Sequence, residues 1–202
     1  MPRPRREDYE GAWQHVMNRG IGRAKIFITD ADRLGFLECL EAAITRYALQ
    51  VHAYCLMGNH FHLLVLSEKG LMSDGMRFLS ARFTQRINYR DHRDGPLFRG
   101  RFASVIIKSD AHLVRVSRYI HRNPVEGGLA RTPEDWVWSS AGAYLGTRRA
   151  PAWLHTDAIL EMFGMAAQAE YRSFLAAGVD EETRASYVDW TGLEQGGQTR
   201  RV

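Results

Sequence analysis

Two histidines separated by a single residue, His60 and His62, are the part of this sequence best suited to binding a metal ion. They open an apolar run over residues 60–66 that is typical of a β-strand. Because side chains alternate across a strand, both imidazoles should lie on one face, while Phe61 between them should point into the core. Histidine offers a neutral ring nitrogen at physiological pH, so the pair predicts ligands for a divalent cation. For these two residues alone, a hydrogen-bonded histidine pair is the alternative.

Tyr119 and Asn123 form a second pair of chemically useful side chains, four residues apart in a stretch with helical spacing of its apolar residues. On a helix the phenol and the amide share one face. A phenol can serve as a nucleophile, but its pKa of about 10 requires a nearby cation or base at neutral pH. Beside the histidine pair, Tyr119 indicates attack on a phosphodiester, with Asn123 completing the metal site. Alone, Tyr119 would indicate only a buried helix tyrosine.

The elements that must position these residues follow the order β-α-β-β-α-β-α. The expected ranges are strand 13–19, helix 30–48, strands 50–57 and 60–66, helix 73–89, strand 103–108 and a helix from 110 to between 123 and 128. This order predicts an α+β fold of the ferredoxin-like split β-α-β type, with an antiparallel sheet. The last helix, which carries Tyr119, is an addition to that layout and packs near the central strands. A compact aromatic segment over residues 136–144 should fold back onto the domain.

Charge divides the chain into two parts. Residues 1–150 carry a net charge of +8, whereas residues 151–202 carry four arginines against eight acidic residues, a net charge of −4. We therefore expect one domain over residues 1–150 and an acidic, helical C-terminal extension and tail over residues 151–202. A basic domain favours a polyanionic partner, and arginine, which gives bidentate contacts with phosphate, accounts for most of the positive charge.

Four arginines are candidates for contacts with the phosphates of a nucleic acid. Two are a helical turn apart on the second helix, where a solvated helix face is the alternative. The other two alternate with Phe98 and Phe102, which combines charge with stacking surface as in single-stranded nucleic-acid sites, although both phenylalanines could equally belong to the core. The predicted phosphate contacts are Arg82, Arg86, Arg99 and Arg101.

Several features exclude other classes of protein. No run of 18 or more apolar residues occurs, and the first residues lack the apolar region of a secretory signal, so we expect no membrane partner and a cytoplasmic protein. Cys39 and Cys55 lie in apolar periodic segments without CxxC spacing, which predicts buried free thiols. The sequence has no Walker-type nucleotide-binding motif, which agrees with attack of Tyr119 on a phosphodiester without the use of ATP.

Five segments taken together resemble the REP-associated tyrosine transposases, which are single-tyrosine HUH endonucleases. They occur in the family's order and cover roughly residues 13–145. The segments are His15–Gly20, His52–His62, Leu97–Phe102, Tyr119–Pro124 and Trp136–Ser140. Gly58 departs from the pattern, which has proline before the Asn-His pair; glycine should loosen this turn but removes no ligand.

The resemblance implies a metal-dependent single-stranded DNA endonuclease and strand transferase that cleaves near DNA hairpins. Tyr119 would be the nucleophile and would form a 5′-phosphotyrosine link, leaving a free 3′-hydroxyl. His60, His62 and Asn123 would bind Mg²⁺ or Mn²⁺. The partner would be single-stranded DNA with a REP-like hairpin, and the protein would be nucleoid-associated. Whether it is a monomer or a homodimer, and whether Tyr119 serves the histidines of its own chain, stay open.

Two other classes of function remain as alternatives. A non-enzymatic nucleic-acid binder could use the ferredoxin-like sheet, but such modules usually stack bases on strand aromatics, where this chain has histidines. A zinc hydrolase would need a further histidine or carboxylate ligand and an open coordination position. His15, His52 and His112 are available for that purpose, but their spacing is uninformative.

Overall fold

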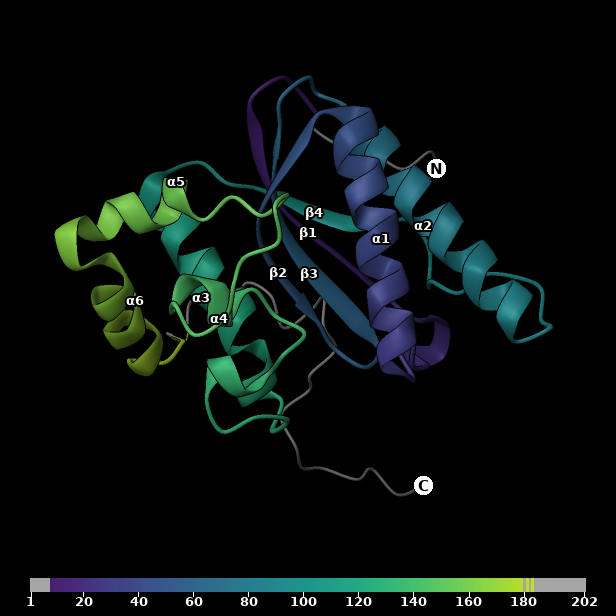
Figure 1. The fold of residues 1–202 in the computed structure, drawn as a ribbon. Coiled ribbons are helices and arrows are strands. Elements are labelled where there is room, and N and C mark those ends of the chain that lie inside the picture. The colour runs from purple at the N-terminus through teal and green to yellow at the C-terminus, as the bar shows by residue number, and fades with distance from the viewer. Residues whose placement is uncertain (1–7, 180, 182, 184–202) are drawn as a thin grey trace, which may run out of the picture.

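An antiparallel sheet with the strand order β2-β3-β1-β4 forms the centre of the computed structural model, which describes residues 8–179, 181 and 183 (Figure 1). The strands are β1 (Ala12–Arg19), β2 (Leu49–Leu56), β3 (His60–Ser67) and β4 (Ala103–Ile106). The histidine-bearing strand β3 lies between β1 and β2, so it is a central strand. Together with the chain order β-α-β-β-α-β, this arrangement confirms the predicted ferredoxin-like α+β fold.

The three longest helices of the described residues lie close to the positions predicted from the apolar spacing. They are α1 (Asp30–Tyr47), α2 (Met72–Arg90), α3 (Asp110–Glu126), α4 (Ala141–Tyr144), α5 (Asp157–Leu160) and α6 (Ala167–Ala176). Short 3-10 turns occur at Ile21–Arg23, Pro133–Asp135 and Glu161–Ala166. No helix in the described ranges is long and apolar enough to cross a membrane.

The sheet separates two hydrophobic layers (Figure 1). Helices α1 and α2 cover one face, and α3 with the shorter C-terminal helices lies against the other. Phe61 belongs to the first layer, where its ring centroid is 4.8 Å from that of Phe36. The alternation of side chains along β3 therefore sends Phe61 toward α1 and both neighbouring histidines toward α3, as predicted.

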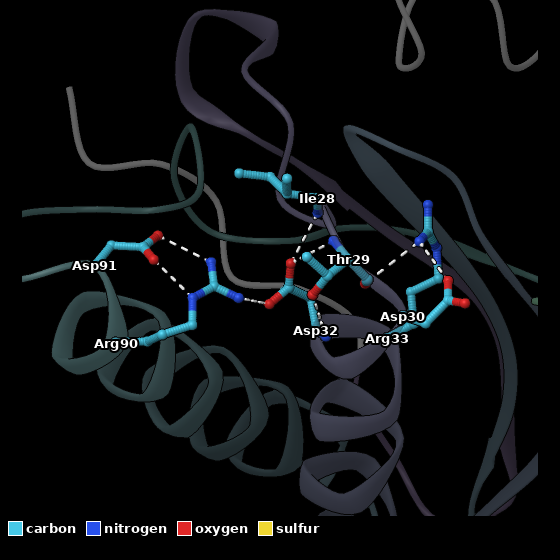
Figure 2. A network of polar contacts seen from close by, with 7 residues as sticks. All are labelled: Ile28, Thr29, Asp30, Asp32, Arg33, Arg90 and Asp91. Atoms are coloured by element: carbon cyan, nitrogen blue, oxygen red, sulfur yellow. Dashed lines mark hydrogen bonds and ion pairs between the residues drawn. The ribbon is translucent and has the colours of Figure 1, made fainter.

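A polar network joins the end of α2 to the beginning of α1 (Figure 2). Thr29 caps α1, and the buried carboxylate of Asp32 accepts hydrogen bonds of 2.8 Å from the backbone N–H groups of Ile28 and Thr29. Arg90 forms ion pairs with both Asp32 and Asp91. Because the capping carboxylate and the guanidinium satisfy each other, the two helices behind the sheet have a defined relative position.

The segment after α3 folds back onto the edge strand β2, as the aromatic pattern predicts. The backbone N–H of Leu56 donates to the carbonyl of Trp138 at 2.9 Å, and Nε1 of Trp136 donates to the carbonyl of Leu56 at 3.1 Å. This segment satisfies backbone groups that an edge strand would otherwise expose. Cys39 and Cys55 are free thiols and both are buried, which confirms that expectation.

The C-terminal part of the described chain packs on α3. Tyr171 and Leu175 of α6 are buried in the same hydrophobic layer as Val116 and Ile120 of α3. Helix α5 of this part is short, because a 3-10 turn that contains Gly164 in the left-handed region (φ 71°) follows it. The division of the chain at residue 150 stays a prediction, and residues 184–202 of the predicted extension lie outside the described residues.

Candidate active site

Strand β3 and helix α3 bring the predicted site residues together within one chain. The rings of His60 and His62 have centroids 5.0 Å apart on the face of the sheet that α3 covers. Oδ1 of Asn123 lies 3.3 Å from Nε2 of His60, and the ring centroid of Tyr119 lies 5.5 Å from that of His62. Residues that are some sixty positions apart in the sequence thus form a single cluster of two imidazoles, one amide and one phenol.

Local sequence accounts for the orientation of α3. Ser109 caps the helix, with its hydroxyl accepting a hydrogen bond of 3.2 Å from the N–H of His112. Leu113, Val116 and Ile120 are buried against the sheet. Because these positions recur at three- and four-residue spacing, the helix face that they define also carries Tyr119 and Asn123 toward β3.

Burial keeps the two histidines of β3 neutral. Burial is the main reason why the pKa of His60 is lowered to about 4. The hydrogen bond to Asn123 raises this pKa, and the positive charge of Arg19 lowers it further. The pKa of His62 lies well below its ordinary value for the same main reason, followed by the effects of His60 and His15. Both rings therefore offer unprotonated nitrogen near neutral pH, as metal ligation requires.

In the neutral ring of His60, the single N–H is best placed on Nδ1, which faces away from α3. Nδ1 lies 2.6 Å from Oδ1 of Asn59, which can only accept, while Nε2 faces Oδ1 of Asn123. A neutral imidazole has one N–H, so it can satisfy only one of these two oxygens. With the closer oxygen of Asn59 as the acceptor, lone pairs of Nε2 and of Asn123 converge, which is the arrangement that a cation stabilises.

The ring of His62 has one engaged nitrogen and one that is not. Its Nδ1 lies 3.0 Å from Nε2 of His15, whereas its Nε2 is buried and has no hydrogen-bond partner among the residues that the structure describes. Buried polar atoms are normally paired, so this nitrogen fits a ligand for a metal ion. His60, His62 and Asn123 together therefore suit the predicted divalent cation.

The donor set consists of two imidazoles and an amide oxygen. Over the described residues, no group of three or more His, Cys, Asp or Glu side chains is arranged to hold a metal. The third donor of the candidate site is the side chain of Asn123, which such a group would not include. Three protein ligands leave coordination positions for water or for oxygens of a phosphate.

His15 is a site residue that spacing along the sequence did not identify. Its ring lies against His62, with centroids 5.1 Å apart, and at 5.8 Å from the ring of Tyr119. It is fully buried, and burial followed by the effect of His112 lowers its pKa to about 3. The available signal was its place in the predicted first strand, but only the pairing of β1 with β3 shows which residues it meets.

The four predicted phosphate contacts lie in two different parts of the structure. Arg99 and Arg101 are exposed in the segment that leads into β4. Arg82 and Arg86 belong to α2, which packs with α1 on the face opposite α3 (Figure 1). Of the four, the structure therefore places only Arg99 and Arg101 on a loop that leads to the strand ends near the histidines.

The surroundings of these arginines also differ. Arg86 forms an ion pair of 2.8 Å with Glu38, and the guanidinium carbon of Arg82 lies 5.4 Å from the ring centroid of Phe78. Phe98 and Phe102 are 6% and 5% exposed and belong to the layer under α1 and α2. Of the two alternatives left open for Phe98 and Phe102, base stacking and core packing, the structure supports core packing.

Comparisons with known proteins agree with this geometry. The solved structures that are similar to this chain include the following two. A REP-associated tyrosine transposase bound to a REP hairpin is 19% identical, with a TM-score of 0.62 over 78% of this chain and 93% of the other. A protein from Deinococcus radiodurans described as a transposase is 18% identical, with a TM-score of 0.42 over 60% of this chain and 97% of the other. The first similarity shows a shared fold.

No curated protein matches the chain. The model of the family "Transposase IS200 like" matches residues 9–123, which is more than half of the sequence. The matched range begins before β1, includes both histidines of β3 and ends at Asn123 of α3. The family predicted from the motifs is confirmed at this level: the chain belongs to the IS200-like transposase family.

Proposed function

We propose that this protein is a metal-dependent single-stranded DNA endonuclease and strand transferase of the REP-associated type, which cleaves near a DNA hairpin. One observation carries the proposal: the phenol of Tyr119, the paired imidazoles of β3 and the amide of Asn123 meet in one buried cluster. The solved relative bound to a REP hairpin supports a hairpin as the DNA feature that is recognised.

In this mechanism the hydroxyl oxygen of Tyr119 attacks the phosphorus of the scissile phosphodiester. A bond from the tyrosine oxygen to phosphorus forms as the bond to the 3′-oxygen breaks, which gives a 5′-phosphotyrosine link and a free 3′-hydroxyl. The phenolic proton passes to water and the leaving oxygen takes up a proton. Because the link conserves the energy of the phosphodiester, attack by another 3′-hydroxyl rejoins DNA without ATP.

A divalent ion, Mg²⁺ or Mn²⁺, held by His60, His62 and Asn123 would supply positive charge to the nonbridging oxygens of the phosphate. The chain itself contributes orientation. Tyr119 is only 7% exposed, so the rings around it restrict its phenol to few positions and exclude most water. The site thus provides the alignment that attack on a phosphodiester requires.

The same contacts support catalysis within one chain. Tyr119 already lies beside His62 of its own chain, with ring centroids 5.5 Å apart. Helix α3 is also held to α6, since Arg122 donates a hydrogen bond of 2.8 Å to the carbonyl of Leu175. These contacts support a site whose tyrosine and histidines come from the same protomer.

The test replaces Tyr119 by phenylalanine. The unaltered chain, incubated with Mn²⁺ or Mg²⁺ and hairpin-bearing single-stranded DNA, should give a DNA adduct that survives denaturation, and a chelator should abolish it. Tyr119→Phe should give none, while Tyr89→Phe, at an exposed position on α2, should react like the unaltered chain. An adduct with Tyr119→Phe would refute the mechanism. Hairpin binding without any adduct from the unaltered chain would favour the non-enzymatic nucleic-acid binder.

A further inference from the structure

Arg19, the last residue of β1, lies beside the metal ligands. In the antiparallel pairing of β1 with β3 it is the direct partner of His60. Directly opposite residues of an antiparallel pair project to the same face, so the guanidinium of Arg19 shares the face that carries His60. Arg19 lies in the segment His15–Gly20 that carries part of the family resemblance, but it was not among the predicted phosphate contacts.

The loop after β1 brings a second arginine to the same place. Gly20 donates from its N–H to the carbonyl of Asn59 at 2.9 Å, and Nδ2 of Asn59 donates to the carbonyl of Arg23 at 3.3 Å. The backbone of Arg23 is in the left-handed region, with a φ of 62°, directly after Gly22. Such a conformation is unfavourable for a side-chain-bearing residue and is most often retained at functional sites.

Arg99 approaches from the other side of β1. Its N–H donates to the carbonyl of Arg19 at 2.9 Å, and Nδ2 of Asn18 donates to the carbonyl of Gly100 at 3.1 Å. Three arginines from three separate segments are therefore held around the end of β1. The hydrogen bonds of Asn18 and Asn59 fix the two loops that carry the outer pair.

The charges of these arginines reinforce one another. Arg23 and Arg99 are exposed and have no ion-pair partner among the residues described. Burial, followed by the positive charges of Arg99 and Arg23, lowers the pKa of the Arg19 guanidinium. Like charges brought together in this way repel, and a bound anion relieves that repulsion.

The position of the arginines relative to Tyr119 indicates which part of a DNA strand they meet. Tyr119 contacts His62 and His15, whereas Arg19 is the partner of His60. In phosphoryl transfer the attacking and leaving oxygens are roughly in line across phosphorus. An attack from the side of Tyr119 therefore directs the leaving 3′-oxygen, and the strand that bears it, toward the end of β1.

We propose that Arg19, Arg23 and Arg99 form a binding site for a backbone phosphate of the leaving DNA strand, the one that ends in the new 3′-hydroxyl. The inference rests on the proposed function. The site would retain this strand while the other strand stays bound to Tyr119 through its 5′-phosphate, and it would receive the incoming 3′-hydroxyl strand in the reverse reaction. It thus serves strand transfer more than cleavage.

The test compares two double variants that remove the same charge. Arg23→Ala with Arg99→Ala removes the exposed pair of the proposed site, and Arg46→Ala with Arg77→Ala removes two exposed arginines of α1 and α2 on the opposite layer. Binding of oligothymidylate is measured as a function of salt in the Tyr119→Phe background. A second experiment uses variants that keep Tyr119 and the hairpin-bearing DNA that forms the adduct. It measures the fraction of this adduct that is transferred to an added oligonucleotide with a free 3′-hydroxyl.

For Arg23→Ala with Arg99→Ala, we expect a salt dependence of log K that is shallower by about 0.7, because the site holds one phosphate of single-stranded DNA. We also expect transfer per adduct to fall about tenfold, because two charge-assisted contacts are lost. The control pair should change neither quantity. Equal salt dependences for the two double variants would refute the arginine site, and a shallower dependence with an unchanged transfer ratio would refute its assignment to the leaving strand. Absence of any adduct from the unaltered chain would refute the proposed function, and the salt comparison would still decide the arginine site.

Discussion

His15 of β1 and His62 of β3 are joined side by side, with 3.0 Å between Nε2 of His15 and Nδ1 of His62. This contact occupies one of the two ring nitrogens of His62. The other nitrogen, Nε2, is buried and unpaired within the described part of the chain. Metal-binding histidines are generally oriented by a partner at their second nitrogen, and His15 occupies that place here.

Replacing His15 by alanine should weaken binding of Mn²⁺ about tenfold, because the ring of His62 loses the partner that sets its orientation and tautomer. Isothermal titration calorimetry measures this without DNA or turnover. His15→Gln, whose side-chain oxygen can accept a hydrogen bond, should recover part of the affinity. His92→Asn, at an exposed position, serves as the control. An unchanged Mn²⁺ affinity for His15→Ala would show that His15 only fills space.

Tyr171→Phe should lower the free energy of unfolding by about 1–3 kcal/mol, because it leaves buried polar atoms unpaired. The hydroxyl of Tyr171 donates to Oγ of Ser117 at 3.0 Å and lies 2.6 Å from Nδ1 of His121, both on α3. Denaturant unfolding measures the change, with Tyr89→Phe as a control because Tyr89 is 87% exposed. A difference below about 0.5 kcal/mol between the two variants would contradict a stabilising role for this network.

Stability should fall as the pH is lowered from about 7 to about 5. Burial lowers the pKa of several histidines in the folded chain, whereas in the unfolded chain they take up a proton near pH 6.5. The unfolded state then binds more protons in this range, so each histidine costs up to about 1.4 kcal/mol of stability per pH unit. These histidines are His15 and His121, with a pKa of about 3, His52 and His60, with a pKa of about 4, and His62.

Thermal unfolding in a buffer with a chelator tests this pH dependence without a contribution from bound metal. His52→Gln removes one of the titrating rings, and His52 packs against Trp13 and His155, outside the candidate metal site. This variant should lose less stability than the unaltered chain between the two pH values. A melting temperature that is constant from about pH 7 to about pH 5 would contradict the expectation.

Short-range patterns predicted most of the site. The spacing of His60 and His62 placed both on one face of β3, and the spacing of Tyr119 and Asn123 placed both on one face of α3. These inferences depend only on the periods of a strand and a helix, which extend over a few residues. The same periodicity predicted correctly that Phe61 is buried on the other face.

Patterns of charge were less informative than patterns of spacing. Arg82 and Arg86 form a regular stripe on α2, yet this helix lies on the layer opposite the histidines. A stripe of arginines shows which face of a helix is polar, but not on which side of the sheet the helix packs. The sequence also left the burial of Phe98 and Phe102 open, because residues in a loop follow no periodic pattern that distinguishes core from surface.

The sequence by itself determined the ferredoxin-like order of elements, the candidate metal ligands and the likeness to a transposase family, because each depends on residue types and local spacing. Only the tertiary structure decided that His15 and Arg19 join the site. Both depend on the antiparallel register of β1 with β3, where Arg19 is opposite His60. That register is a long-range relationship, set by burial on both faces of the sheet and by the turns between strands, and no local pattern encodes it.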